Sequence, residues 1–269
     1  MKKVLFTAAM IAVAASNVGA QTPVTAIDGS QGWAPVNRFG SAEAVRGSQT
    51  IDGAYNRGTN PGSLHFSGAA DVSGGLRNRV ALLNPTGFGL LANLESVGFD
   101  WYRSAASTTG AIQSPALRLF VSSGERNATL SELIWEWAYN GTGDAPTGAW
   151  QTVSNSLATG TWWRFSGGQQ SCSVNNDQQL YTALGNWSNC LGAGAVVYGI
   201  SVGLGSLPDA GSFDGAVDLP TLKFAQQSAT LWDFGTSSTV VPEPSTYALM
   251  AAGLAGLFAV QRRRRRQSV

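Results

Sequence analysis

The chain has 269 residues, a formal net charge of +1 and only 12% charged residues, and glycine occurs 33 times. Between Gln21 and Val241, ten lysines and arginines stand against fifteen aspartates and glutamates, so this part has a net charge of −5. Proteins that bind nucleic acid need clustered basic side chains for the phosphate backbone. An acidic body without a basic stripe therefore argues against nucleic-acid binding.

The N-terminus has the pattern of a secretory signal peptide. Lys2 and Lys3 are followed by an apolar run to Ala15, and small residues then lead to Ala20. This order of charge, apolar run and small residues is typical of an export signal that is removed after small residues. We expect residues 1–20 to be cleaved, so that the mature chain begins at Gln21. A buried N-terminal helix or strand is the less favoured alternative, because of the two lysines.

The body, residues 21–234, carries repeated strand patterns. Apolar residues occupy alternate positions, as in half-buried strands, in the ranges 97–103, 117–121, 133–139, 196–204 and 230–234. Clusters of glycine, asparagine and aspartate between these ranges indicate turns. We predict a mainly β ectodomain, an antiparallel β-sandwich of jelly-roll or concanavalin-like type with one short helix. Strands near the two chain ends should lie close together.

The range 196–204 makes a more specific prediction. Val196, Tyr198, Ile200, Val202 and Leu204 occupy alternate positions, with Val197, Gly199, Ser201 and Gly203 between them. We expect the first row to be buried. The glycines and serine should form a flat opposite face that another layer or a ligand can approach closely.

The two cysteines, Cys172 and Cys190, both lie in the exported part. In an oxidising compartment they should form a disulfide. The residues between them predict the short helix, from Asp177 to Trp187. A metal pair is the alternative, but it has no nearby ligand partners, and His65 is the only histidine in the chain.

The sequence contains no pattern typical of an enzyme. His65 accompanies no nucleophile motif. The carboxylate pairs Glu132/Glu136 and Asp214/Asp218 would each lie roughly 13 Å apart on a straight strand, which is too far for glycoside hydrolysis. A glycan-cleaving enzyme remains a remote alternative. Asp209, Asp214 and Asp218 are candidates for a structural calcium site, although a role in turns is favoured; no other cofactor is expected.

Tryptophans supply an alternative function for the body. Trp135, Trp137 and Tyr139 should share one face of the strand 133–139, while Trp162 and Trp163 should point to opposite faces of another. An exposed aromatic row could stack on sugar rings, as in a carbohydrate-binding module for exopolysaccharide or another glycan. Packing in the core is favoured over this platform for most tryptophans.

The C-terminus has three parts in a fixed order. After a linker, residues 235–241, come Pro242-Glu243-Pro244, an apolar stretch predicted to form a transmembrane helix over residues 246–261, and a basic cluster made up of Arg262, Arg263, Arg264, Arg265 and Arg266. The stretch from Thr246 to Val260 reaches roughly 23 Å as a helix, short of a ~30 Å hydrocarbon core. The arginines act as a stop-transfer signal, because positive charge stays on the cytoplasmic side.

This tail, residues 242–269, resembles the PEP-CTERM sorting signal of Gram-negative bacteria, which is read by a membrane protease called exosortase. The resemblance implies transient anchoring in the inner membrane with the ectodomain in the periplasm, and then cleavage near Pro242 to Pro244. The range 211–224 with Trp232-Asp233-Phe234 is also similar to the last two strands of sandwich ectodomains that carry such tails. The resemblance implies association with the outer surface or with secreted exopolysaccharide. Together with the lack of an enzyme pattern, we predict a non-enzymatic, exported protein of the cell surface or extracellular matrix.

Overall fold

The computed structural model describes residues 21–36, 47–69, 78–122, 130–166, 182–205 and 211–237, together with residues 253 and 255. The ectodomain lies in one compact unit, Gly19–Thr239. No helix among the described residues is long and apolar enough to cross a membrane.

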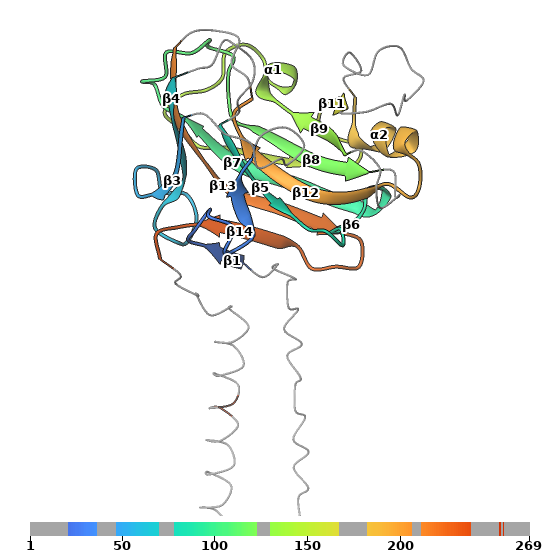
Figure 1. Cartoon of the computed structure of the whole chain (residues 1–269). Helices are drawn as coiled ribbons and strands as arrows, with labels where there is room; N and C mark the ends of the chain where they lie inside the picture. The colour runs from blue at the N-terminus through green and yellow to red at the C-terminus, as the bar shows by residue number, and fades with distance from the viewer. Residues whose placement is uncertain are drawn as a thin grey trace, which may run out of the picture. The chain divides into compact units, whose positions relative to one another are not determined.

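The described part of this unit is mainly β, with two short α-helices and one 3-10 turn (Figure 1). In chain order the elements are β1 (Gln21–Val24), β2 (Trp33–Pro35), β3 (Ser48–Asp52), β4 (Ser63–Ala69), β5 (Arg79–Leu83), β6 (Gly89–Leu90), η2 (Leu91–Asn93), β7 (Leu94–Arg103), β8 (Ala116–Ser122), β9 (Ser131–Trp135), α1 (Trp137–Asn140), β10 (Gln151–Asn155), β11 (Trp162–Ser166), α2 (Leu184–Leu191), β12 (Val196–Gly203), β13 (Ser212–Phe224) and β14 (Thr230–Phe234).

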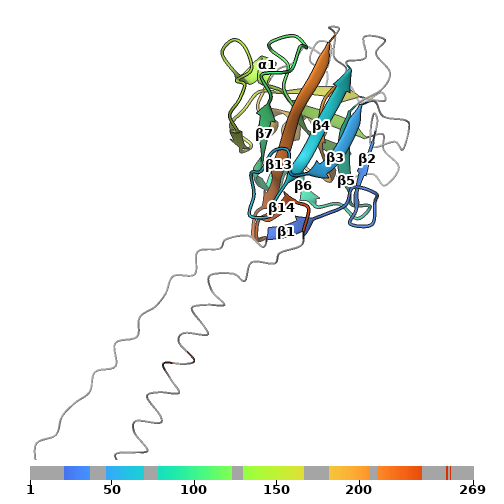
Figure 2. The ribbon, with the colours of Figure 1, turned by 90° about the vertical axis from the view of Figure 1, so that its left-hand side faces the viewer.

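The strands form two sheets. In the first sheet the long strand β13 pairs along one edge with β7, which continues to β10. Along its other edge β13 pairs first with β4 and then with β14. β3 continues the sheet beyond β4, and β1 continues it beyond β14. Figure 2 shows β7, β13, β4 and β3 side by side. The second sheet has the order β11-β9-β8-β12-β5-β2, and β6 also pairs with β12.

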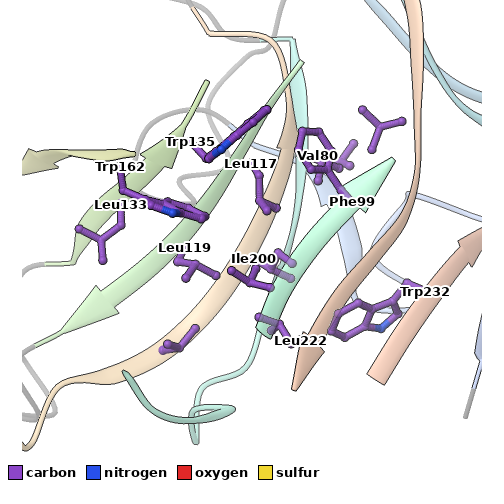
Figure 3. Close-up of a cluster of buried hydrophobic side chains, with 14 of the residues drawn as sticks. Val80, Phe99, Leu117, Leu119, Leu133, Trp135, Trp162, Ile200, Leu222 and Trp232 are labelled. Carbon is purple, nitrogen blue, oxygen red and sulfur yellow. The ribbon is translucent and has the colours of Figure 1, made fainter. Parts of the chain in front are cut away.

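Side chains from both sheets meet in one hydrophobic core (Figure 3). Leu119, Leu133 and Ile200 of the second sheet are fully buried, and Phe99 and Leu222 of the first sheet are almost so. The period-two pattern explains this arrangement, because every second residue of a strand points to the same face. Burial of large aromatic and branched side chains between the sheets is the main source of stability.

The prediction of two sheets of mainly antiparallel strands is confirmed, with one exception. β1 and β14 pair in parallel, with Gln21 opposite Leu231 and Val24 opposite Phe234. No hairpin joins these two strands, so nothing in the chain requires them to be antiparallel. The expectation that strands near the chain ends lie close together is therefore confirmed, whereas an entirely antiparallel sandwich was wrong.

The helices differ from the prediction. Strand β9 ends at Trp135, and residues 137–140 form the helix α1 where the pattern predicted a continued strand. The second helix, α2, begins at Leu184 and not near Asp177, which lies outside the described residues. Leu184, Trp187 and Leu191 of α2 are buried, so the helix packs by one apolar face.

The expected burial pattern of β12 is correct for only half of the strand. Ile200, Val202 and Leu204 are buried in the core, but Val196 and Tyr198 are only partly buried and Val197 takes the core position. The pairing of β12 with β8 shifts register between Val197 and Gly199. Such a bulge reverses which residues face the core, because it inserts one extra residue.

The opposite face of β12 is also buried. A side chain added at Gly199 would place its Cβ only 2.5 Å from Cδ2 of Phe120. Arg79 of β5 and Glu132 of β9 meet over this face through two hydrogen bonds of 2.8 and 3.0 Å, although β8 and β12 lie between their strands. The sheet therefore curls around this pair, and the flat Gly-Ser-Gly strip is covered by neighbouring side chains of the same chain.

Candidate functional site

A polar and aromatic row crosses the outer face of the first sheet, the face seen in Figure 2. Ala216 of β13 is paired with Tyr102 of β7 on one side and with His65 of β4 on the other. The indole ring of Trp150, just before β10, lies 5.7 Å from the ring of Tyr102. Tyr102 points outward because Trp101, its neighbour in the strand, points into the core.

The loop between β3 and β4, residues 53–62, places a further aromatic ring on this row. The ring of Tyr55 lies 4.5 Å from that of Tyr102 and 5.3 Å from that of His65. Its hydroxyl donates a hydrogen bond of 2.6 Å to Oδ2 of Asp214. The methyl side chain of Ala216 leaves room for this ring between Tyr102 and His65.

His65 lies between two carboxylates. Its Nδ1 is 2.8 Å from Oδ2 of Asp52, and its Nε2 is 2.8 Å from Oδ1 of Asp214. A neutral imidazole has only one N–H, so both contacts are hydrogen bonds only when the ring is protonated. Burial lowers the pKa of His65, but the hydrogen bonds to Asp214 and Asp52 outweigh burial and raise it above the usual value. The same contacts help to hold the pKa values of Asp52 and Asp214 below the usual value, against the effect of burial.

Arg57 attaches the 53–62 loop to strand β7. Its Nε donates to Oδ2 of Asp100 over 2.5 Å, and Nη2 donates to the hydroxyl of Thr152 over 3.0 Å. The Asp100 side chain is nearly buried, whereas that of Arg57 is 37% exposed. This pair fixes the loop beside the aromatic row.

Two fully buried carboxylates hold the rest of the loop. Oδ2 of Asp218 accepts the backbone N–H of Gly58, and Oδ2 of Asp233 accepts those of Thr59 and Asn60. Asp218 also accepts the backbone N–H groups of Leu219 and Phe234. Burial, together with repulsion from Asp233, raises the pKa of Asp218 to about 8. Leu219 has a φ of 51°, at the register shift where β13 bends beneath the loop.

Gly58 is required at its position. A Cβ built on this residue would lie 2.0 Å from Oδ1 of Asp233, well inside van der Waals contact. The loop backbone can therefore reach the buried carboxylates only because this residue has no side chain. The result is a loop with a fixed shape that holds Tyr55 on the aromatic row.

The tryptophans proposed as a glycan platform lie in separate places. Trp135 and Trp162 belong to the core, and Trp137 lies on α1 with its ring 5.7 Å from the buried Trp101. The expected row of Trp135, Trp137 and Tyr139 does not form, because the strand ends at Trp135. Trp163 is partly exposed on the other face of β11, and its Nε1 donates to Oε2 of Glu136 over 3.2 Å.

The candidate calcium ligands do not form a cluster in the described part of the chain. Asp209 lies outside the described residues, and Asp214 and Asp218 on β13 contact different partners. Among the described residues, no group of three or more histidine, cysteine, aspartate or glutamate side chains could hold a metal ion. In the pair Glu132/Glu136, Glu132 bonds to Arg79 and Glu136 to Trp163.

Cys190, on α2, is not a free thiol. Cys172 lies outside the described residues, so the bond between Cys172 and Cys190 stays a prediction. Pro242 to Pro244 and Arg262 to Arg266 also lie outside them, as do the signal peptide and nearly all of the predicted transmembrane helix.

A comparison with known families identifies the C-terminal part. Residues 240–265 match the model of the PEP-CTERM protein-sorting motif. The chain carries a PEP-CTERM sorting motif. The matched range contains Pro242-Glu243-Pro244, the apolar stretch and the arginines from Arg262 to Arg265. No curated protein and no solved structure matches the chain.

The PEP-CTERM motif implies an exported protein that interacts with an exosortase and is processed by it. Proteins with this motif are exported and associated with the cell surface.

Sequence reasoning missed the aromatic row on the first sheet. The alternation in 97–103 already indicated that Tyr102 and Asp100 face away from Trp101, which was the available signal. Tyr55 and Trp150 carry no such signal, because they lie outside regular alternation and reach the row only through the fold.

Proposed function

We propose that the protein is a non-enzymatic component of the cell surface or extracellular matrix of a Gram-negative bacterium. Its ectodomain crosses into the periplasm, its tail holds it in the inner membrane, and an exosortase-like protease releases or transfers it by cutting near Pro242 to Pro244. The match of residues 240–265 to the PEP-CTERM motif carries this proposal.

The composition of the tail supports transient anchoring. The apolar stretch is short for the hydrocarbon core, and Gly253 and Gly256 each weaken an isolated helix by about 1 kcal/mol relative to alanine. The arginines oppose passage of the chain end, because each charge at the bilayer centre costs roughly 2.5 to 3.5 kcal/mol on insertion scales. Pro242 and Pro244 keep the cleavage region extended, outside the helix.

The absence of an enzymatic role is a proposal that rests on how the acidic residues are used. Glu132 is paired with the buried Arg79, Asp218 accepts three backbone N–H groups, and Asp214 bonds to His65 and Tyr55. These carboxylates satisfy structural donors. Glycoside hydrolysis requires instead two carboxylates that face one substrate position.

Mass spectrometry of the protein recovered from native cells tests the sorting proposal. We expect a C-terminus near Pro242 to Pro244 and no arginine cluster. Replacing Pro242-Glu243-Pro244 with alanines should keep the full-length chain in the inner membrane. Replacing Ser237-Ser238-Thr239 with alanines, just before the motif, should leave processing unchanged. A native protein that retains Arg262 to Arg266, or normal processing of the first variant, would overturn the proposal.

A further inference from the structure

We propose that the outer face of the first sheet binds a neutral polysaccharide along an aromatic strip formed by Tyr55, Tyr102 and Trp150. Nothing in the sorting motif requires such a site, and the strip includes no residue of the tail. Through this strip the ectodomain would bind a polysaccharide of the extracellular matrix after sorting.

The geometry of the rings is the first argument. Tyr55 and Tyr102 are tilted by 35° and Tyr102 and Trp150 by 51°, and consecutive centroids lie 4.5 and 5.7 Å apart. All three side chains are partly exposed. Three adjoining rings, inclined to one another, therefore expose aromatic surface on a face that also carries His65 and the carboxylates of Asp52 and Asp214. The C–H faces of sugar rings can pack against such a surface, while their hydroxyls reach polar groups at its edge.

The strip is held in shape before any ligand arrives. Tyr55 is fixed by its bond to Asp214, and its loop is held by Arg57 on Asp100 and by Gly58 on Asp218. Tyr102 is part of the regular strand β7. Binding to a preformed surface costs little ordering of loops and side chains, so weak individual contacts can add up to useful affinity.

Two carboxylates lie on the His65 side of the strip. The side chains of Asp52 and Asp214 are 37% and 32% exposed. Besides His65, Asp52 accepts hydrogen bonds from Thr50 and Ala54, and Asp214 accepts them from Tyr55 and Ser104. A carboxylate has about four acceptor positions, so each keeps capacity for one more donor. Such partly exposed carboxylates accept hydrogen bonds from sugar hydroxyls. Asp214 contacts the Tyr55 hydroxyl, and Asp52 contacts His65, whose ring lies 5.3 Å from that of Tyr55.

The charges select for a neutral chain. Among the described residues, two groups beside the strip that can carry a positive charge already contact carboxylates: His65 contacts Asp52 and Asp214, and Arg57 contacts Asp100. The body as a whole has a net charge of −5 between Gln21 and Val241. An acidic polysaccharide would meet carboxylates without gaining a new cation, and like charges at an interface disfavour binding.

The test uses the full-length chain purified in detergent and a panel of polysaccharides. Neutral glucans, mannans and galactans are compared with anionic alginate. The variants are Trp150→Ala and Tyr102→Leu, the latter chosen to keep an apolar side chain on the strand. The matched control is Trp163→Ala, which removes a partly exposed tryptophan from the second sheet. Thermal unfolding shows whether each variant remains folded.

We expect at least one neutral polysaccharide to bind, and Trp150→Ala and Tyr102→Leu each to weaken binding by about tenfold or more, as for aromatic anchors in other interfaces. Trp163→Ala should bind like the unmodified chain. The proposal is overturned if no neutral polysaccharide binds, or if folded strip variants bind as well as the control. Binding to alginate alone, lost when Arg262 to Arg266 become glutamine, would assign binding to the tail and also overturn it.

Discussion

The buried carboxyl of Asp218 predicts an unusual dependence of stability on pH. Its folded pKa of about 8 lies above the ordinary value of 3.8, so between these values the folded protein holds a proton that the unfolded chain has released. A carboxyl group whose pKa is higher in the folded than in the unfolded protein contributes stability that is fully present below the unfolded pKa. This contribution is lost as the pH rises toward the folded pKa. The ectodomain should therefore become less stable as the medium changes from mildly acidic to neutral.

The size of the effect follows from one proton. The free energy of unfolding should fall by about 1.4 kcal/mol for each pH unit while the folded state alone holds the proton. Between pH 5 and 6.5 this amounts to about 2 kcal/mol. This pH window lies below the raised pKa of His65. Loss of the His65 proton would also lower the free energy of unfolding, but only at higher pH. The window also lies above the lowered pKa values of Asp52 and Asp214. Protonation of these two carboxylates would destabilise the folded protein only in more acidic solution.

Urea unfolding of the segment Gln21 to Thr239 at half-unit pH steps measures this slope. Asp218→Asn cannot release a proton, so its profile should be flatter by about 1.4 kcal/mol per pH unit. This variant should be less stable at pH 5, because its amide meets the N–H of Gly58 as a donor. Asp28→Asn, at an exposed turn, should keep the slope of the unmodified segment. A flat profile in the unmodified segment, or an equal slope in Asp218→Asn, would refute the reasoning.

Two further substitutions test the structure. Glu132→Gln removes the negative charge of the buried pair with Arg79 and should destabilise the ectodomain by about 3 to 5 kcal/mol. Glu95→Gln, at the exposed pair with Lys223, should cost less than about 1 kcal/mol. Equal effects in urea unfolding would contradict the importance of the buried pair. Gly58→Ala places a methyl group against Asp233 and should lower the free energy of unfolding by about 1 to 3 kcal/mol. Gly53→Ala should have little effect, because a Cβ added there has no contact within 4 Å. Unchanged stability of Gly58→Ala would show that the loop is not held as described.

Local patterns were informative where a strand is straight and one of its faces meets the core. The range 230–234 coincides with β14, and the range 97–103 lies within β7, with Val97, Phe99 and Trp101 buried as the alternation predicts. The patterns failed where the backbone departs from regular geometry. The bulge in β12 exchanged the roles of Val196 and Val197, and the turn after Trp135 replaced a strand by α1. Hydrophobicity does not report such local changes in backbone direction, because the residues on both sides of them are similarly apolar.

The sequence by itself determined the destination of the protein, since the sorting motif is recognised as a short linear pattern whose parts must follow one another at the C-terminus. It also determined the β character of the ectodomain, because alternation is a local property of the chain. The aromatic strip and its support were decided only by the tertiary structure. Tyr55, Tyr102, Trp150 and Asp214 are distant in sequence, and they meet because β7 and β13 pair and because a loop without a side chain at Gly58 can reach two buried carboxylates. A site built by strand pairing and loop closure depends on contacts between residues far apart in the chain, and no local pattern encodes these contacts.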